Sequence, residues 1–261
     1  MNKSSNVEKL LIVILIILGL AVFAGICWGD SNCSSVDVKD EKDTTTLISL
    51  TNSFDTILFN PETNCAEWVK WKITVDRLKK KNKVKRSDYP FTPDDTPLLQ
   101  DKITTYDYSK SGYDRGHLSP AADNEHSKTA MKDCMEMTNI IPQTPELNRG
   151  PWKTLEESCR KWALSYNSTV YIAAGPVFSD TAEVRFVGRV QVPDRCFKVI
   201  LIQKPMIARG WIMDNSRKPE NDYQAYRVSV DSVEALTGYD FFSWLPDSIE
   251  NKIEKSSYEK E

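Results

Sequence analysis

Residues 112–121 of the chain are Gly-Tyr-Asp-Arg-Gly-His-Leu-Ser-Pro-Ala, and the side chains that carry chemistry in this stretch are Arg115 and His117. An unperturbed imidazole has a pKa of about 6.5, so His117 can act as a general base. The rate of the catalysed reaction is then expected to rise as the ring deprotonates near neutral pH. In an extended segment Arg115 points to the same side as His117, where its guanidinium can pair with phosphate. A lone histidine is more often structural, but the surrounding glycine, arginine and downstream polar residues favour a site.

A second polar group follows within residues 138–160. Asn148 precedes a long predicted helix and offers a neutral carbonyl oxygen, a ligand type that Mg²⁺ accepts, although an asparagine there more often caps the helix. Glu156 and Arg160 are four residues apart on one edge of that helix; the plainer interpretation is a surface ion pair.

Outward from these residues, hydrophobic periodicity predicts an α+β fold with a mostly antiparallel central sheet flanked by helices. Residues 69–75 alternate between apolar and polar side chains, which predicts a half-buried strand. Residues 77–86 are basic and form either a solvated loop or a rim that contacts phosphate. Residues 89–100 are predicted to be a loop. Helices are predicted at residues 127–137, 152–166 and 232–236, and Gly238 is expected to end the last of them. Extended segments are predicted at residues 138–142, 170–174, 197–203, 206–213 and 226–230. Pro142 is expected to end the first of these segments, and a Gly175-Pro176 turn the second.

The chain divides by composition into four segments. Residues 1–29 hold an uncharged apolar run, Leu10 to Cys27, which predicts a signal peptide or a membrane anchor and hence an exported protein, either secreted or membrane-attached. Residues 30–50 form a polar linker, residues 51–246 the folded domain, and residues 247–261 a charged, frayed tail.

The bulk composition limits the function classes. A net charge of −3 and a pI of 5.6 argue against a tight, counterion-releasing nucleic-acid binder. With only two histidines and no Cys-x-x-Cys pair, the composition argues against a structural zinc site. Export would permit disulfides, and the five cysteines beyond the apolar run allow at most two intrachain bridges, with a connectivity that spacing does not reveal.

Four linked motifs resemble the DNA/RNA non-specific endonuclease family, which includes secreted bacterial nucleases and mitochondrial endonuclease G. They are residues 112–121, residues 138–143 (Thr-Asn-Ile-Ile-Pro-Gln), residues 147–156 (Leu-Asn-Arg-Gly-Pro-Trp-Lys-Thr-Leu-Glu) and residues 171–178 (Tyr-Ile-Ala-Ala-Gly-Pro-Val-Phe). The resemblance runs from about Glu67 to Phe242 and implies a ββα-metal (His-Me finger) active site.

The resemblance assigns a role to each matching residue. His117 would be the general base, Asn148 the direct metal ligand, Arg115 a phosphate-binding residue, Glu156 a holder of metal-bound water, and Arg160 a stabiliser of the phosphate in the transition state. Asn139 would help to fix the imidazole or else brace the turn. The basic residue that members carry upstream has no clean match, and Lys85 and Arg86 are candidates.

The family also implies Mg²⁺ as cofactor, with Mn²⁺ able to substitute, DNA and RNA as substrates, 5′-phosphate products and, in some members, a homodimer. Attachment to a membrane would run through Leu10 to Cys27. Two alternatives stay open: a catalytically silent relative that binds nucleic acid or protein, and a phosphodiesterase that acts on small nucleotides. Retention of His117, Asn148, Glu156 and Arg160 together favours an active nuclease.

Overall fold

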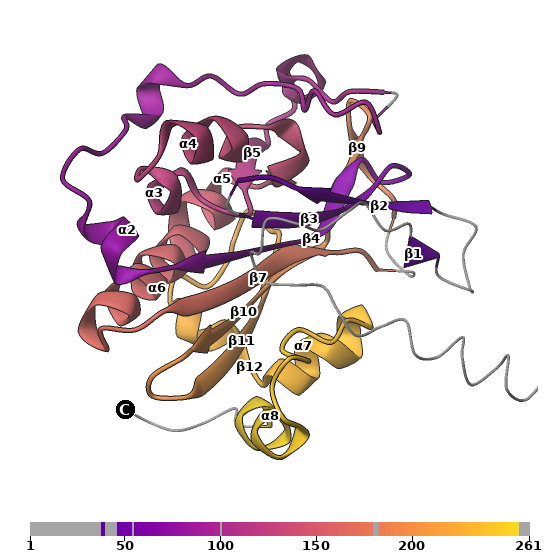
Figure 1. The fold of residues 1–261 in the computed structure, drawn as a ribbon. Helices are drawn as coiled ribbons and strands as arrows, with labels where there is room; N and C mark the ends of the chain where they lie inside the picture. The colour runs from indigo at the N-terminus through magenta and orange to yellow at the C-terminus, as the bar shows by residue number, and fades with distance from the viewer. Residues whose placement is uncertain (1–37, 40–45, 54, 100, 180–182, 256–261) are drawn as a thin grey trace, which may run out of the picture.

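A large antiparallel sheet forms the centre of the molecule (Figure 1). The computed structural model describes residues 38–39, 46–53, 55–99, 101–179 and 183–255. Eight strands pair in the order β1-β2-β3-β4-β7-β10-β11-β12, and each neighbouring pair is antiparallel. Their bounds are β1 Val38–Lys39, β2 Thr46–Thr51, β3 Asp55–Asn60, β4 Cys65–Ile73, β7 Val170–Val177, β10 Arg195–Ile202, β11 Ile207–Asp214 and β12 Arg227–Val228. The predicted α+β class is confirmed.

Helices and two small hairpins complete the described chain. The hairpins are β5 Asp114–His117 with β6 Ile140–Gln143, and β8 Phe186–Val187 with β9 Val190–Gln191. The α-helices are α2 Val75–Lys79, α3 Ala121–Asn124, α4 Lys128–Cys134, α5 Pro145–Leu147, α6 Lys153–Ser165, α7 Val230–Thr237 and α8 Asp247–Glu254. Shorter helical turns are η1 Arg86–Asp88, η2 Thr105–Tyr108, η3 Met137–Asn139, η4 Asn148–Trp152 and η5 Tyr223–Tyr226.

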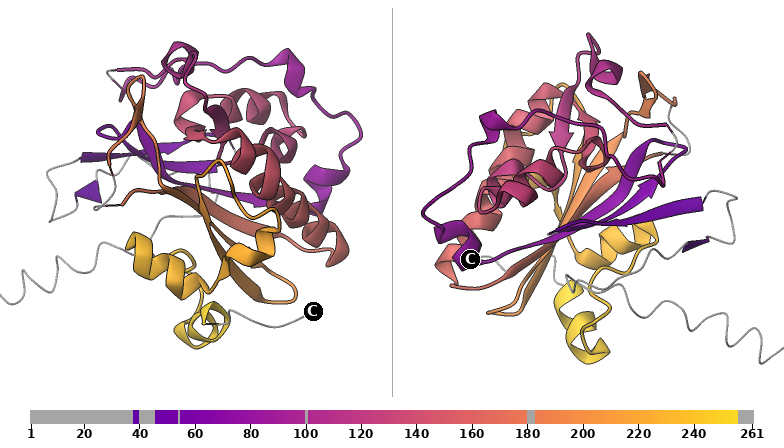
Figure 2. Two further views of the ribbon diagram at one scale, coloured as in Figure 1. Left: turned by 180° about the vertical axis from the view of Figure 1, so that it is seen from behind. Right: turned by 45° about the horizontal axis from the view of Figure 1, so that its top comes forward.

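The sheet is covered on both faces. The helices α3, α4 and α6 and the β5–β6 hairpin lie over one face, and α7 and α8 lie over the other (Figures 1 and 2). Val69 and Trp71 therefore join the core under α6, whereas Trp68 joins the core under α7. The expectation of a half-buried strand at residues 69–75 is corrected accordingly: β4 is buried on both sides, and Val75 already belongs to α2.

The Gly175-Pro176 turn predicted after residue 174 is wrong. β7 continues to Val177, and Gly175 pairs with Phe197 of β10. A Cβ built on Gly175 would approach the carbonyl oxygen of Glu67 to 2.1 Å, so this glycine allows two backbones to come close together inside the sheet. In the same way Pro142 does not end its strand, because β6 runs to Gln143 and Pro142 pairs with Arg115.

The long helix α6 agrees with the predicted range 152–166 to within one residue at each end. A kinked turn, η4, precedes α6, and Gly150 within it has the non-helical angles φ −101° and ψ −118°. From Lys153 the helix is regular, and Leu155, Cys159 and Ala163 of the predicted apolar stripe are buried. Residues 226–230, predicted to be one strand, contain β12 and the first residue of α7. Helix α7 ends as expected at Gly238, which has the left-handed conformation with φ 75°.

Both expected terminal segments contain secondary structure. Strands β1 and β2 begin within the predicted 30–50 linker, and α8 occupies residues 247–254 of the predicted frayed tail. The side chain of Glu254 is buried against the domain. The apolar run Leu10 to Cys27 lies outside the described residues, and none of the helices within them is long and apolar enough to cross a membrane.

The cysteines of the described chain are free thiols. Cys65, Cys134, Cys159 and Cys196 are all buried, and the disulfides expected among them are not formed. Cys134 packs in a small cluster under α4, whereas the other three lie in the main core. Burial raises the pKa of Cys159 and of Cys196 to about 12, so both thiols stay protonated.

Candidate active site

The β5–β6 hairpin and α6 together form a ββα unit around His117. Cross-strand pairing places Arg115 opposite Pro142 and His117 opposite Ile140. At the end of the strand, the Leu118 amide donates to the Asn139 carbonyl at 3.0 Å. The indole Nε1 of Trp152, immediately before α6, donates to the His117 carbonyl oxygen at 3.3 Å. The backbone of His117 is thus held by both the second strand and the start of the helix.

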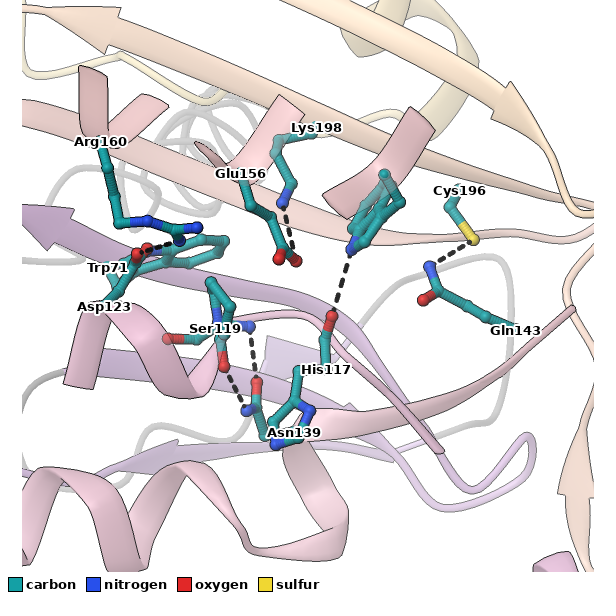
Figure 3. A network of polar contacts seen from close by, with 12 residues as sticks. Trp71, His117, Ser119, Asp123, Asn139, Gln143, Glu156, Arg160, Cys196 and Lys198 are labelled. Atoms are coloured by element: carbon teal, nitrogen blue, oxygen red, sulfur yellow. Dashed lines mark hydrogen bonds and ion pairs between the residues drawn. The ribbon is translucent and has the colours of Figure 1, made fainter. Parts of the chain in front are cut away.

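Asn139 fixes the turn that follows His117. Its Oδ1 accepts the Ser119 amide at 2.9 Å and its Nδ2 donates to the Ser119 carbonyl oxygen at 2.9 Å (Figure 3). The same Nδ2 also donates to the carbonyl oxygen of Cys134 at 2.8 Å. Both amide hydrogens and the oxygen are therefore occupied by backbone groups. Of the two roles considered for Asn139, the contacts favour bracing of the turn, which positions the histidine through the backbone.

The His117 ring lies in a partly buried, mainly apolar setting. It packs against the Phe91 ring with centroids 5.2 Å apart, and its Nε2 is 3.4 Å from the Met135 sulfur. Burial and, to a smaller extent, the positive charge of Arg86 lower the pKa of His117 to about 3. The sequence-based expectation of a value near 6.5 is corrected: the imidazole is neutral, and available to accept a proton, throughout the range around neutral pH.

Two arginines share the Phe91 ring with His117. The guanidinium carbon of Arg115 is 4.7 Å from the ring centroid and that of Arg86 is 5.0 Å from it. Both side chains are exposed. Of the two upstream candidates, Lys85 and Arg86, it is Arg86 that makes this contact. The arrangement places two cations at the solvent side of a neutral base, where a phosphate can be held by planar guanidinium groups.

Asn148 is oriented by an acidic residue of the first motif. Its Nδ2 donates to Asp114 Oδ2 at 2.9 Å, and Arg149 clamps the same carboxylate with Nε at 2.8 Å and Nη2 at 2.6 Å. These contacts hold the pKa of Asp114 below its ordinary value despite partial burial. Asn148 has helical backbone angles and follows α5, whose cap is Thr144, so the capping interpretation of Asn148 is wrong.

The segment that carries Asn148 is tied to the far end of the sheet. The Thr144 amide donates to Asn215 Oδ1 at 2.8 Å, and the Thr144 hydroxyl donates to the Ser216 carbonyl at 2.7 Å. Asn215 Nδ2 donates in turn to the carbonyl oxygens of Pro142 and Pro193, each at 2.9 Å. Asn215, directly after β11, therefore fixes the end of β6 and the start of α5 together.

Glu156 faces a buried lysine on the central sheet. Lys198 Nζ is 3.8 Å from Glu156 Oε1, its side chain is 0% exposed, and it lies 4.1 Å from the centroid of the Trp152 ring (Figure 3). Burial raises the pKa of Glu156 to about 7, and the Lys198 charge is the largest influence that opposes this rise. The Lys198 ammonium makes no hydrogen bond to any of the described residues, so its main compensation is the Glu156 carboxylate.

Arg160 pairs with Asp123, and the surface ion pair between Glu156 and Arg160 is not formed in the described structure. Arg160 Nη1 is 2.8 Å from Asp123 Oδ1, and Trp71 Nε1 donates to Asp123 Oδ2 at 2.9 Å. Figure 3 shows Arg160 and Glu156 extending from α6, Arg160 toward Asp123 and Trp71, and Glu156 toward Lys198. The helix thus presents both side chains inward.

Asp114, Asp123 and Lys198 are among the contributors to the site that were not predicted from the sequence. Asp114 lies within the first motif, but neither its spacing nor the family resemblance assigned it a role. Lys198 carried a readable signal, because a single ionisable residue within the apolar run 196–202 is unusual for a buried strand. Asp123 had none, since its partners Trp71 and Arg160 are distant in sequence.

The donors of the site fit a hard divalent cation. The Asp114 carboxylate holds the Asn148 nitrogen, which leaves the amide oxygen as the group that can face an ion. The Glu156 carboxylate supplies a second oxygen donor. Asn148 would hold the ion directly and Glu156 would act from beside it.

Known proteins share this architecture. A family model described as DNA/RNA non-specific endonuclease matches residues 40–248. The chain is 37% identical to a nuclease of Nostoc sp. over 208 residues, which cover 75% of this chain and 73% of the relative. It is 31% identical to the mitochondrial endonuclease G of Homo sapiens over 196 residues, covering 70% of this chain and 65% of that protein, slightly less than two thirds.

A solved structure agrees in fold. The crystal structure of the EndoG/EndoGI complex superposes with a TM-score of 0.67 at 26% identity, and the match covers 76% of this chain and 86% of that one. The ββα unit, the residues gathered around it and the match over residues 40–248 lead to one conclusion: the chain belongs to the DNA/RNA non-specific endonuclease family.

Proposed function

We propose that this protein is a Mg²⁺-dependent endonuclease that hydrolyses phosphodiester bonds of DNA and RNA without strong sequence specificity and leaves 5′-phosphate ends. The observation that carries the proposal is the grouping of a neutral His117, two exposed arginines around Phe91, and an Asn148 oxygen oriented by Asp114. These are the base, the phosphate contacts and the metal ligand that the reaction requires.

The protein's own groups divide the work of hydrolysis. The neutral imidazole of His117 accepts the proton of the attacking water, and its ring is held against Phe91 by a backbone fixed at Trp152 and Asn139. Arg115 and Arg86 hold the phosphate, and Arg160, paired with Asp123, adds positive charge from α6. Because phosphate contacts carry no base information, this set accounts for cleavage without sequence preference.

When bound at Asn148, a divalent cation supplies positive charge that stabilises the leaving 3′ oxygen. Asp114, by holding the Asn148 nitrogen, would leave the amide oxygen free to bind the ion, and the Lys198 charge would keep the Glu156 carboxylate ionised beside it. The neutral ligand leaves most of the ion's charge for the phosphate.

Digestion assays separate this proposal from the two alternatives. Purified protein is given supercoiled plasmid, structured RNA and a dinucleotide, with and without Mg²⁺, next to the His117→Ala and Asn148→Ala variants. The proposal expects Mg²⁺-dependent cleavage of both polymers, with products that a 5′-phosphate-dependent ligase can rejoin. A silent relative would leave all three substrates intact, and a small-nucleotide enzyme would cut only the dinucleotide.

We also propose that the chain is exported, as a secreted or membrane-attached enzyme, because Leu10 to Cys27 forms an uncharged apolar run of 18 residues behind Lys3 and Lys9. Cell fractionation with sequencing of the mature N-terminus tests this. A mature chain that starts after the run indicates a cleaved signal, and an intact N-terminus in the membrane fraction indicates an anchor. An intact chain in the cytosol would refute export.

A further inference from the structure

The two C-terminal helices bring three carboxylates together on the face of the sheet opposite the active site. Asp231 and Glu234 belong to α7, Glu254 ends α8, and one oxygen of each lies within 4.8 Å of the others. Figure 1 shows α7 and α8 side by side beneath the sheet, away from the β5 hairpin. The proposed hydrolysis uses none of these residues.

Glu254 is an unusual member of this group, because it is buried without a partner. The residue is 4% exposed, and its Oε1 is a buried atom with no hydrogen-bond donor among the described residues. Glu250 Oε1, one helical turn earlier, is in the same condition. A buried carboxylate oxygen normally has a donor or a cation, since leaving it without one costs about 1–3 kcal/mol or more.

The neighbouring negative charges add to the free-energy cost of burying Glu254 without a hydrogen-bond donor. The carboxylates of Glu234, Glu250, Asp231 and Asp240 all repel a negative charge on Glu254. A divalent cation would neutralise two of these charges and satisfy several oxygens at once.

We propose that Asp231, Glu234 and Glu254, with Glu250 beside them, form a structural Ca²⁺ site that fastens α8 to α7. Ca²⁺ accepts several carboxylates with oxygens at about 2.3–2.6 Å, so oxygens on opposite sides of the ion are about 4.6–5.2 Å apart. Mg²⁺ requires near-ideal octahedral geometry and usually retains several waters in place of an all-protein cage, so a group of carboxylates suits Ca²⁺ better. Oxygens that lie within 4.8 Å of one another can therefore surround Ca²⁺.

The hydrogen bonding of Glu234 agrees with this assignment. Its Oε1 accepts the Phe241 amide at 2.9 Å, which fixes the carboxylate and leaves its second oxygen for an ion. Phe241 itself is buried in the core beneath α7. Binding of the ion would thus join α8, which is otherwise rich in charged residues, to a rigid part of the domain.

Thermal unfolding of the full chain tests the site without reference to nuclease activity. The Asn148→Ala variant serves as background, so that the active-site cation does not contribute, and melting is followed in EDTA, in CaCl₂ and in MgCl₂. Saturating Ca²⁺ should raise the Tm by about 5 °C or more, and Mg²⁺ should raise it less. Adding Glu254→Gln should abolish the Ca²⁺ shift and leave the Tm in EDTA unchanged or higher, because one repelling charge is gone.

Glu183→Gln, at an exposed glutamate distant in sequence from α7 and α8, is the matched control and should keep the full Ca²⁺ shift. If the Glu254→Gln protein does not fold, Asp231→Asn together with calorimetric Ca²⁺ titration replaces it, with loss of binding expected. The proposal is overturned if Ca²⁺ does not stabilise the background protein, or if it stabilises the Glu254→Gln protein equally.

Discussion

Replacing Lys198 by methionine removes the cation that faces Glu156 from β10. The two charges are 3.8 Å apart, and the lysine side chain is 0% exposed. At that distance and an effective dielectric constant of about 20, their attraction is about 4 kcal/mol, equivalent to a change of about 3 in the pKa of Glu156. With a pKa of about 7 in the parent, Glu156 is mostly ionised at pH 7.5; in the variant it would be almost wholly protonated.

The expected result is a fall in kcat of about 100-fold at pH 7.5, with recovery as the pH is raised. The parent rate should rise through pH 7 as Glu156 ionises, and this limb should move to alkaline pH in Lys198→Met. The measurement is initial-rate cleavage of a fluorescent duplex from pH 5 to 10, with circular dichroism to verify folding.

Two comparisons decide whether Lys198 acts through Glu156. Lys161→Met, at an exposed lysine of α6, should leave the profile unchanged. Combining Lys198→Met with Glu156→Gln should cost no more than Glu156→Gln alone, because both changes remove the same carboxylate charge. A Lys198→Met enzyme with the parent's rate and profile, or losses that add in the double variant, would refute the reasoning.

Three further outcomes follow from the site. His117→Ala should lower kcat by about 10²–10⁴-fold and keep the rise of the rate with pH near pH 7, because the pKa of His117 lies near 3 and that rise is assigned to Glu156. Disappearance of the rise in the variant would contradict the assignment to Glu156. Asn148→Ala should weaken the response to Mg²⁺ by at least about 10-fold, and an unchanged Mg²⁺ midpoint in cleavage titrations would remove it as a ligand. Trp71→Phe should lower the free energy of unfolding by about 1–3 kcal/mol in urea titrations, because the buried Asp123 loses a hydrogen bond; a stability equal to the parent's would show that bond to be dispensable.

Local patterns predicted the elements whose partners are close in sequence. The apolar stripe at Leu155, Cys159 and Ala163 indicated α6, and the glycine at 238 indicated the end of α7. The motif around His117 predicted the ββα unit through resemblance to a known family. Errors arose where a distant neighbour decided the conformation: Gly175 reads as a turn in sequence, but serves to let β7 approach the backbone of Glu67.

The electrostatics of the site could not be derived from sequence. The pKa of His117 depends on Phe91 and Arg86, which reach it from a loop that has no periodic pattern. Likewise Lys198 meets Glu156 only because β10 lies beneath α6 in the folded sheet. Spacing along one helix suggested a Glu156–Arg160 pair, whereas each of these residues is paired across the core.

Asn215 has a consequence for the order in which activity can appear during synthesis. It fixes Thr144 and Pro142, which flank the segment leading to Asn148, yet it follows every proposed catalytic residue in the chain. A nascent or truncated chain that ends before it contains His117, Asn148, Glu156 and Arg160 but lacks the group that holds the end of β6 against the start of α5. Nuclease activity is therefore expected to require completion of the sheet through β11, because an unfinished chain would carry the proposed residues of the site without their alignment.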